Sequence, residues 1–290
     1  MGKFIRLSKG FTINLQGKPE PQVSDLETPD TVSVKPTDFQ GLYMPKVVVN
    51  EGDQVKAGQV LFHDKKHPDI AFTAPVSGEV VEVKRGEKRK LLEVKILADR
   101  ANEFLNFRKF SVSDIASAPA EEIRKQLLES GAWVNLVQRP FGIIADPTAT
   151  PKAIHISAFD SAPAAPDDSI LFKGQDQFFQ AGVDVLSRLT SGKVHVNLHA
   201  SMEVATVFSQ VKGADVNKFQ GQHPAGCVGV QIHHLDPINK GDVVWTINPA
   251  GVIQIDKLFL NGVMDAARII ALTGPNVSKP QYFRTVAGTS

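Results

Sequence analysis

Three polar residues recur at every second position of one apolar segment. His195, Asn197 and His199 alternate with two valines and a leucine. Side chains of a β-strand alternate between its two faces, so the three polar groups would share one face. Two imidazoles beside an amide could ligate a metal ion. We favour the simpler interpretation that this face borders solvent while the valines and the leucine enter the core.

Two other reactive residue types lie later in the chain. His233 and His234 precede a Leu-Asp-Pro segment and resemble a turn after a strand. Adjacent histidines of a strand point to opposite faces and do not easily share one ion, but His233 remains a candidate hydrogen-bonding residue. Cys227 is the only cysteine, and we expect an inert, small apolar residue rather than a nucleophile. No catalytic triad can be assembled from the sequence.

Composition excludes several classes of protein. A single cysteine allows no internal disulfide and no all-cysteine zinc or iron–sulfur site, which fits a reducing compartment. The net charge of +1 gives no electrostatic surplus for holding nucleic acid. The first residues have charges scattered through them, unlike a secretory signal. No run of 18 apolar residues occurs, so we expect no direct membrane span and a cytoplasmic chain.

The 290 residues predict more than one domain. Residues 1–40 are expected to form an irregular N-terminal arm with one or two strands. Residues 41–100 contain short β-branched runs separated by glycine and proline, which indicates a small all-β domain. Its strands are predicted at residues 46–49, 59–62, 71–73, 79–83 and 92–96.

From about Ser113 the pattern alternates between strands and helices, which predicts a parallel sheet covered by helices over residues 101–255. Asp114 is expected to cap a helix whose apolar stripe includes Ile115, Ile123, Leu127 and Leu128. Because the last strands have no closing element, residues 256–290 are expected to begin a further, truncated domain. The other predicted elements are a helix at 175–190 and strands at 153–157, 193–199, 229–233, 243–247, 252–255 and 268–272.

The β-rich segment resembles the barrel-sandwich fold of biotinyl and lipoyl carrier domains in residues 51–61 and 73–80. In those carriers a lysine on the intervening hairpin bears the prosthetic group, so Lys65 would be the attachment point. The alternative is a solvated hairpin. We favour it because His67-Pro68-Asp69 lengthens the hairpin and no carrier-type catalytic domain follows. Lys65 and Lys66 are therefore predicted to stay unmodified.

A wider resemblance covers about residues 40 to 288. Eight segments recur in the same order in the family of A subunits of the bacterial sodium-translocating NADH:quinone oxidoreductase. They are residues 52–55, 64–68, 72–78, 85–89, 129–133, 139–141, 181–186 and 223–226. The resemblance implies three parts: a barrel-sandwich domain, a Rossmann-like α/β domain and the beginning of a β-grasp domain. It implies a peripheral subunit on the inner face of the cytoplasmic membrane, held there by the other subunits.

The family resemblance also bears on cofactors. Related flavin subunits hold phosphate on a glycine-rich loop at a helix N-terminus, but the sequence contains no G-x-G-x-x-G and no P-loop. We therefore expect no flavin, NADH or metal on this chain, with flavins and iron–sulfur centres in partner subunits. The cluster-bearing relatives of Rnf-type complexes need grouped cysteines, which a single cysteine excludes.

The family implies quinone as a ligand. A quinone needs an apolar slot and one or two donors for its carbonyl oxygens. Arg139, Phe141, His223, Pro224, Gly226 and His233 are the expected contact residues. The structural alternative is that Phe141 is core, Arg139 an ion-pair partner and the His-Pro-Ala-Gly segment a turn. The competing hypothesis for the whole chain is a docking subunit without a ligand site, and a Lys65 carrier is the third.

Overall fold

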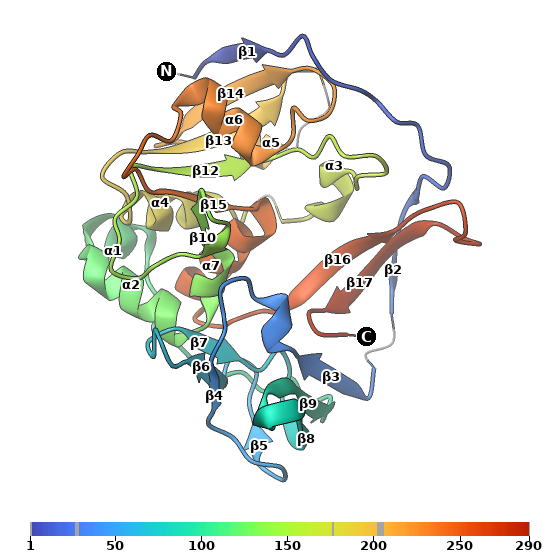
Figure 1. The fold of residues 1–290 in the computed structure, drawn as a ribbon, viewed down its shortest axis with the longest axis vertical. Helices are drawn as coiled ribbons and strands as arrows, with labels where there is room; N and C mark the ends of the chain where they lie inside the picture. Colours follow the sequence, from blue (N-terminus) through green and yellow to red (C-terminus); the bar gives the residue numbers. More distant parts are fainter. Residues whose placement is uncertain (1, 27–28, 176, 202–205, 290) are drawn as a thin grey trace.

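A seven-stranded sheet forms the centre of the computed structural model, which describes residues 2–26, 29–175, 177–201 and 206–289. Five neighbouring strands are parallel, and two antiparallel strands extend one edge (Figure 1). In order across the sheet the strands are β1 (Phe4–Arg6), β14 (Asp215–Gln220), β13 (Lys193–His199), β12 (Ala153–Ser157), β15 (Val244–Ile247), β10 (Val137–Arg139) and β11 (Ile143–Ile144).

The middle strands are largely buried on both faces, as expected of a parallel sheet covered by helices. Ile154, Ile156, Val196 and Trp245 are all fully buried. The strands predicted at 153–157 and 193–199 are confirmed.

The α-helices of the described residues are α1 (Val112–Ser117), α2 (Ala120–Glu129), α3 (Asp168–Leu171), α4 (Gln180–Ser187), α5 (Thr206–Ser209), α6 (Val228–Leu235) and α7 (Pro249–Asn261).

Two predicted strands are wrong, because residues 229–233 lie in α6 and residues 252–255 lie in α7. Helix α7 begins with Asn248, whose side chain accepts a hydrogen bond from the Gly251 amide at 2.7 Å, and continues with Pro249 at the first position. Its residues from 251 to 256 are all buried. The segment Val252-Ile253-Gln254-Ile255 is short and mostly apolar, and periodicity alone does not distinguish such a segment from a buried strand.

Two helix boundaries also differ from the prediction. Ser111 rather than Asp114 caps the first helix, and Asp114 completes the capping box by accepting from the Ser111 amide. Pro119 then separates α1 from α2, so the predicted stripe is shared by two helices. The helix predicted at 175–190 is shorter: it begins at Gln180 and ends at Ser187, while residue 176 lies outside the described residues.

Two small sheets form the barrel-sandwich part, with a shared core that includes Val32, Leu61, Phe72, Val80 and Ile96. One sheet has the order β3 (Thr31–Val34), β9 (Leu91–Ala98), β8 (Gly78–Arg85), β5 (Gln54–Val55). The other has the order β4 (Pro45–Val47), β6 (Val60–Asp64), β7 (Ala71–Thr73). The 3-10 helices are η1 (Pro36–Asp38), η2 (Glu87–Arg89) and η3 (Ala132–Asn135).

A third, three-stranded sheet has the order β16 (Ala267–Leu272), β17 (Gln281–Val286), β2 (Glu20–Asp25). This sheet, called the ribbon from here on, projects from the side of the molecule in Figure 1. The first 34 residues thus supply one strand to each of three sheets: β1 to the central sheet, β2 to the ribbon and β3 to the barrel-sandwich part. The segment predicted as an irregular arm is therefore hydrogen-bonded to three different sheets through its described strands.

Helix α7 runs across the domain boundary predicted at residue 255. The Rossmann-like and β-grasp assignments stay predictions. Among the described residues, no helix is both long enough and apolar enough to cross a bilayer.

His155 is an unusual residue of the core. It is fully buried on β12, stacks on His195 with ring centroids 4.5 Å apart, and both of its ring nitrogens lack hydrogen-bond partners among the described residues. Burial, assisted by His195 and Lys152, lowers the pKa of His155 to about 3. The folded protein therefore holds this imidazole in its neutral form.

We expect this histidine to make the fold sensitive to acid. Its folded pKa lies below the unfolded value of 6.5, so the unfolded chain binds a proton first and stability falls as pH drops from 6.5 towards 3, by up to about 1.4 kcal/mol per pH unit. His155→Phe should flatten the dependence of the melting temperature on pH in this window. His233→Phe, at an exposed position on α6, is the control. An unchanged slope in the His155 variant would contradict the assignment.

Candidate functional site

A crevice of about 760 Å³ opens at the carboxyl ends of β12 and β15. The strand order reverses here, because β13 and β14 lie on one side of β12 and β15 lies on the other. Ligands of open α/β sheets bind at such a switch point. The lining includes Ser157 at the end of β12, Ile247 at the end of β15, and the N-terminal residues of α3, α6 and α7.

Carboxylates give this crevice an acidic character. Asp160 and Asp168 both line it. Burial, with the nearby charges of Asp160 and Asp167, raises the pKa of Asp168 to about 6. The helix N-termini offer partial positive charge, but these carboxylates disfavour a polyphosphate in the same space. The exposed thiol of Cys227 is at the N-cap of α6 and also lines the crevice.

Two of the six predicted contact residues, Arg139 and Gly226, line the crevice. Arg139 is half-buried, and its Nε atom is buried without a partner among the described residues. Gly226 is required by close packing, because an added Cβ would lie 2.5 Å from the amide nitrogen of Ser161. Ser161 Oγ accepts a hydrogen bond from the Gly226 amide at 2.8 Å.

The other four predicted residues lie elsewhere. His223 and Pro224 line a groove of about 660 Å³ between the N-terminal segment and α6, where His223 Nδ1 is 3.1 Å from Ser161 Oγ. Phe141 is not a core residue, because 78% of it is exposed. His233 is exposed on α6 rather than in a turn after a strand. The six residues therefore do not form a single pocket.

A third pocket, of about 270 Å³, lies where the barrel-sandwich part, the α/β part and the β16–β17 ribbon meet. Phe39, Phe72, Val134 and Met264 supply much of its apolar wall. The Phe39 and Phe72 rings meet edge to face, with centroids 4.7 Å apart. Six separated segments of the chain contribute to this pocket, so no local motif predicts it.

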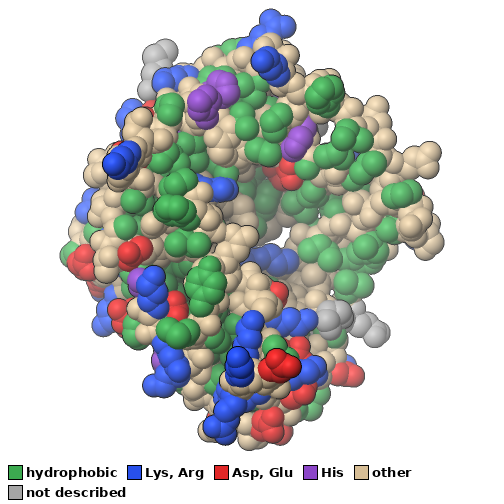
Figure 2. Space-filling view, viewed as in Figure 1, with side chains coloured by type: hydrophobic (Ala, Val, Ile, Leu, Met, Phe, Trp, Pro, Cys, Tyr) green, Lys and Arg blue, Asp and Glu red, His purple; other side chains and the backbone are tan. Residues whose placement is uncertain are grey.

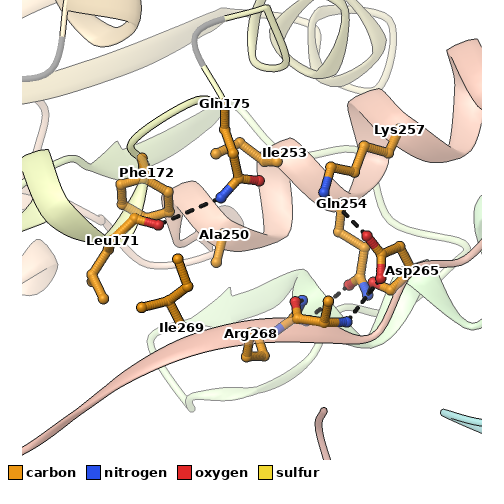
Figure 3. Close-up of a pocket in the computed structure, with 11 residues that line it drawn as sticks. Leu171, Phe172, Gln175, Ala250, Ile253, Gln254, Lys257, Asp265, Arg268 and Ile269 are labelled. Atoms are coloured by element: carbon orange, nitrogen blue, oxygen red, sulfur yellow. Dashed lines mark hydrogen bonds and ion pairs between the residues drawn. The ribbon is translucent and has the colours of Figure 1, made fainter. Parts of the chain in front are cut away.

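Polar groups converge at the base of this pocket. Gln254 Oε1 accepts from Asn135 Nδ2 at 2.9 Å and from Arg268 Nη2 at 3.2 Å, while Gln254 Nε2 donates to the Asp265 carbonyl at 2.7 Å. Figure 3 shows Gln254 from α7 meeting Arg268 from β16 beside the Lys257–Asp265 pair. The sequence gives no signal for this cluster, because its members come from separate elements and none of them belongs to a motif that indicates a binding site.

The histidines of β13 do not form a metal site with their neighbours. Asn197 is fully buried, where it donates to Gln231 Oε1 at 3.0 Å and accepts from Asn217 Nδ2 at 2.9 Å. The expectation that this face borders solvent is therefore wrong at Asn197. The described residues contain no cluster of three or more histidine, cysteine or acidic side chains that could hold a metal ion.

The carrier-type lysine lies on the hairpin between β6 and β7. Lys65 is exposed, and its backbone amide donates to the Met44 carbonyl at 3.0 Å. Asp64 accepts from the amide of Lys66 at 3.0 Å. That both lysines stay unmodified remains a prediction.

Known proteins resemble this chain over both of its main parts. Residues 5–99 match the NqrA N-terminal barrel-sandwich hybrid domain, and residues 118–264 match the NqrA second alpha/beta domain. The A subunit of the Na(+)-translocating NADH-quinone reductase of Neisseria meningitidis serogroup B is 39% identical over 284 residues, which cover 98% of this chain and 63% of that protein.

Two further relatives carry the same name. The protein of Pasteurella multocida is 38% identical over 286 residues, and that of Serratia proteamaculans is 39% identical over 289 residues. Each match covers 99% of this chain and 63% of the relative, so the chain spans somewhat less than two thirds of their length. The resemblance inferred from eight short segments is confirmed, and the chain belongs to the NqrA family.

Proposed function

We propose that the chain is a cofactor-free, quinone-binding peripheral subunit of a membrane complex that couples NADH oxidation and quinone reduction to sodium export. The relatives' name, which designates the A subunit of a Na(+)-translocating NADH-quinone reductase, supplies the reaction. The apolar pocket with a polar base supplies the structural support. Redox centres belong to the partner subunits in this proposal, and those subunits hold the chain on the inner face of the membrane.

The pocket fits the chemistry of a quinone ring. A neutral, flat ligand gains most of its binding free energy from burial and needs few oriented donors. Phe39 and Phe72 provide aromatic surface for the ring. The volume of about 270 Å³ lies just below the usual range of roughly 300–1,000 Å³ for whole ligands. The pocket therefore accommodates the ring, and an isoprenoid tail would leave through the opening.

Arg268 is the donor that we assign to a quinone carbonyl oxygen. A guanidinium has five N–H groups and no acceptor. Two hydrogen bonds, to the Ala267 carbonyl and to Gln254 Oε1, fix its orientation. Because Arg268 also lines the pocket, we assign its remaining N–H groups to the quinone oxygen.

The crevice is an alternative position for the quinone. It adjoins the pocket, because Asp38, Val134 and Asn135 line both. Arg139 would then be the donor, as the sequence predicts, with Gly226 allowing close approach of the backbone. Its acidic lining makes the crevice less suitable than the pocket for a carbonyl acceptor.

A docking role for the chain has separate support. Exposed apolar side chains follow the N-terminal segment and the β16 edge; they are Phe4, Phe11, Ile13, Leu15, Ile270 and Leu272. Figure 2 shows hydrophobic side chains gathered on the side of the molecule where β16 and β17 project in Figure 1. Large exposed apolar patches are typical of interaction surfaces. In the competing hypothesis this docking is the only role, and the chain binds no quinone.

Filling or emptying the pocket tests quinone binding. Phe39→Ala should weaken binding of a soluble quinone analogue by roughly 1–3 kcal/mol, because one aromatic contact is lost. Ala266→Phe, which places a ring in the pocket, should block binding. Phe141→Ala removes an aromatic residue that is already exposed, so it is the matched control. Calorimetric titration measures affinity, and thermal unfolding checks that each variant folds.

Each outcome of this titration separates two hypotheses. Normal binding by a folded Ala266→Phe variant would exclude the pocket, and loss of binding in Arg139→Gln would then indicate the crevice. If the unaltered chain binds no quinone analogue at all, the docking hypothesis is favoured.

We expect the purified chain to be colourless and to bind neither flavin nor NADH. The sequence has no glycine-rich phosphate loop, and carboxylates line the crevice at the switch point. Absorbance after gel filtration and titration with NADH measure this. A flavin spectrum that co-elutes with the protein would overturn the cofactor-free assignment.

A further inference from the structure

Arg268 carries a positive charge that no neighbouring carboxylate neutralises directly. Its nearest acidic neighbour, Asp265, is paired with Lys257 at 3.1 Å. Within the described part of the chain, no carboxylate oxygen lies within 4.0 Å of the Arg268 guanidinium. Burial lowers the pKa of Arg268, and the charge of Asp265 only partly opposes this. An uncompensated cation in a partly desolvated position favours a ligand that brings negative charge.

The guanidinium is held in one orientation. Nη1 donates to the Ala267 carbonyl at 3.1 Å, and Nη2 donates to Gln254 Oε1 at 3.2 Å. Gln254 is itself fixed by Asn135 and by the Asp265 carbonyl. Figure 3, which draws the smaller cavity described in the next paragraph, shows the Arg268–Gln254 contact joining β16 to α7. A ligand oxygen therefore meets a preorganised donor and does not have to order a flexible side chain.

Arg268 lies between two cavities. It lines the apolar pocket of about 270 Å³ and also a smaller cavity of about 70 Å³. Lys257 lines the smaller cavity together with Asp265, and Lys35 lines the larger one together with the exposed Asp38. The charged groups of the two cavities are thus three cations and two carboxylates. Lys257 is paired with Asp265, whereas Arg268 and Lys35 both lack an ion pair with a carboxylate in the described part of the chain. Of these two cations, Arg268 is the one whose head group is held in place by hydrogen bonds.

We propose that Arg268 makes this pocket select quinones that carry an ionised ring oxygen over neutral quinones of the same size. The proposal rests on the quinone-binding function proposed above. A hydrogen bond from a guanidinium to an anionic oxygen is roughly twice as strong as one between neutral groups. The apolar wall contributes equally to both ligands, so the difference between them reports on Arg268.

A matched pair of ligands tests the selection. At neutral pH 2-hydroxy-1,4-naphthoquinone is an anion, whereas 2-methoxy-1,4-naphthoquinone has nearly the same shape and no charge. We expect the unaltered chain to bind the anion about tenfold more tightly, the scale of one charge-assisted hydrogen bond. Calorimetry at a pH of about 7.5, where the hydroxy compound is ionised and Arg268 is protonated, measures both affinities on the same protein. This comparison does not require a variant to fold.

Substitutions then assign the selection to one residue. Arg268→Met, which keeps much of the side-chain volume, should weaken binding of both compounds but remove the preference, because the anion loses a charge-assisted hydrogen bond and the methoxy compound only a weaker one. Arg268→Lys should restore part of it, because the charge returns without the planar fork. Arg284→Met is the control, since Arg284 is an exposed arginine on the same ribbon that pairs with Asp25. Thermal unfolding checks each variant.

The outcomes separate the two proposals. If the unaltered chain binds neither compound, the quinone-binding function fails and the charge selection fails with it. If the unaltered chain binds both compounds equally, the quinone pocket stands and the selection is overturned. A preference that survives in folded Arg268→Met also overturns the role of Arg268.

Discussion

The structure depends on one apolar core that runs without interruption from the barrel-sandwich part into the α/β part. Buried residues of both, among them Leu61, Phe72, Trp133 and Ile253, belong to a single cluster. Gly131 of the α/β part packs closely against Thr73 of the barrel-sandwich part. Its φ is 78°, and an added Cβ would lie 2.7 Å from Thr73 Oγ1, so this contact between the two parts requires a glycine. Because the two parts share packed side chains, the pocket at their junction has a defined shape.

The sequence predicts the two-part architecture well, for physical reasons. Short β-branched runs between glycine turns leave few alternatives to a small β unit, and alternating strands and helices indicate a parallel sheet. The errors fall where burial hides the pattern. Helix α7 is buried along most of its first two turns, and even Gln254 and Asp256 are buried there, so its first turns show no clear alternation of apolar and polar faces. In α2 only one side is apolar, so the sequence indicates a helix there, although it does not indicate the residue at which the helix begins.

The candidate site is less predictable than the fold. Motif matching selects Arg139 and Gly226, which do lie in the switch-point crevice. It also selects Phe141, whose exposed position no local pattern reveals. Arg268 and Gln254 acquire a role only through tertiary contact between β16 and α7. Such a role depends on residues of different elements that meet only in the folded structure. Periodicity and motif spacing describe residues that are close in the sequence, so they do not predict it.

The N-terminal segment has a consequence for the order in which the chain folds during synthesis. Its first strand cannot pair until the ribosome has made β14: Lys3 bonds to Asn217 across a separation of 214 residues. Strand β2 likewise waits for β17, whereas β3 can pair with β9 once the barrel-sandwich part has emerged. Long-range pairings of this kind form slowly. The nascent chain therefore carries two unpaired strands until β14 and β17 have been made, and until then they are available to chaperones and to intermolecular pairing.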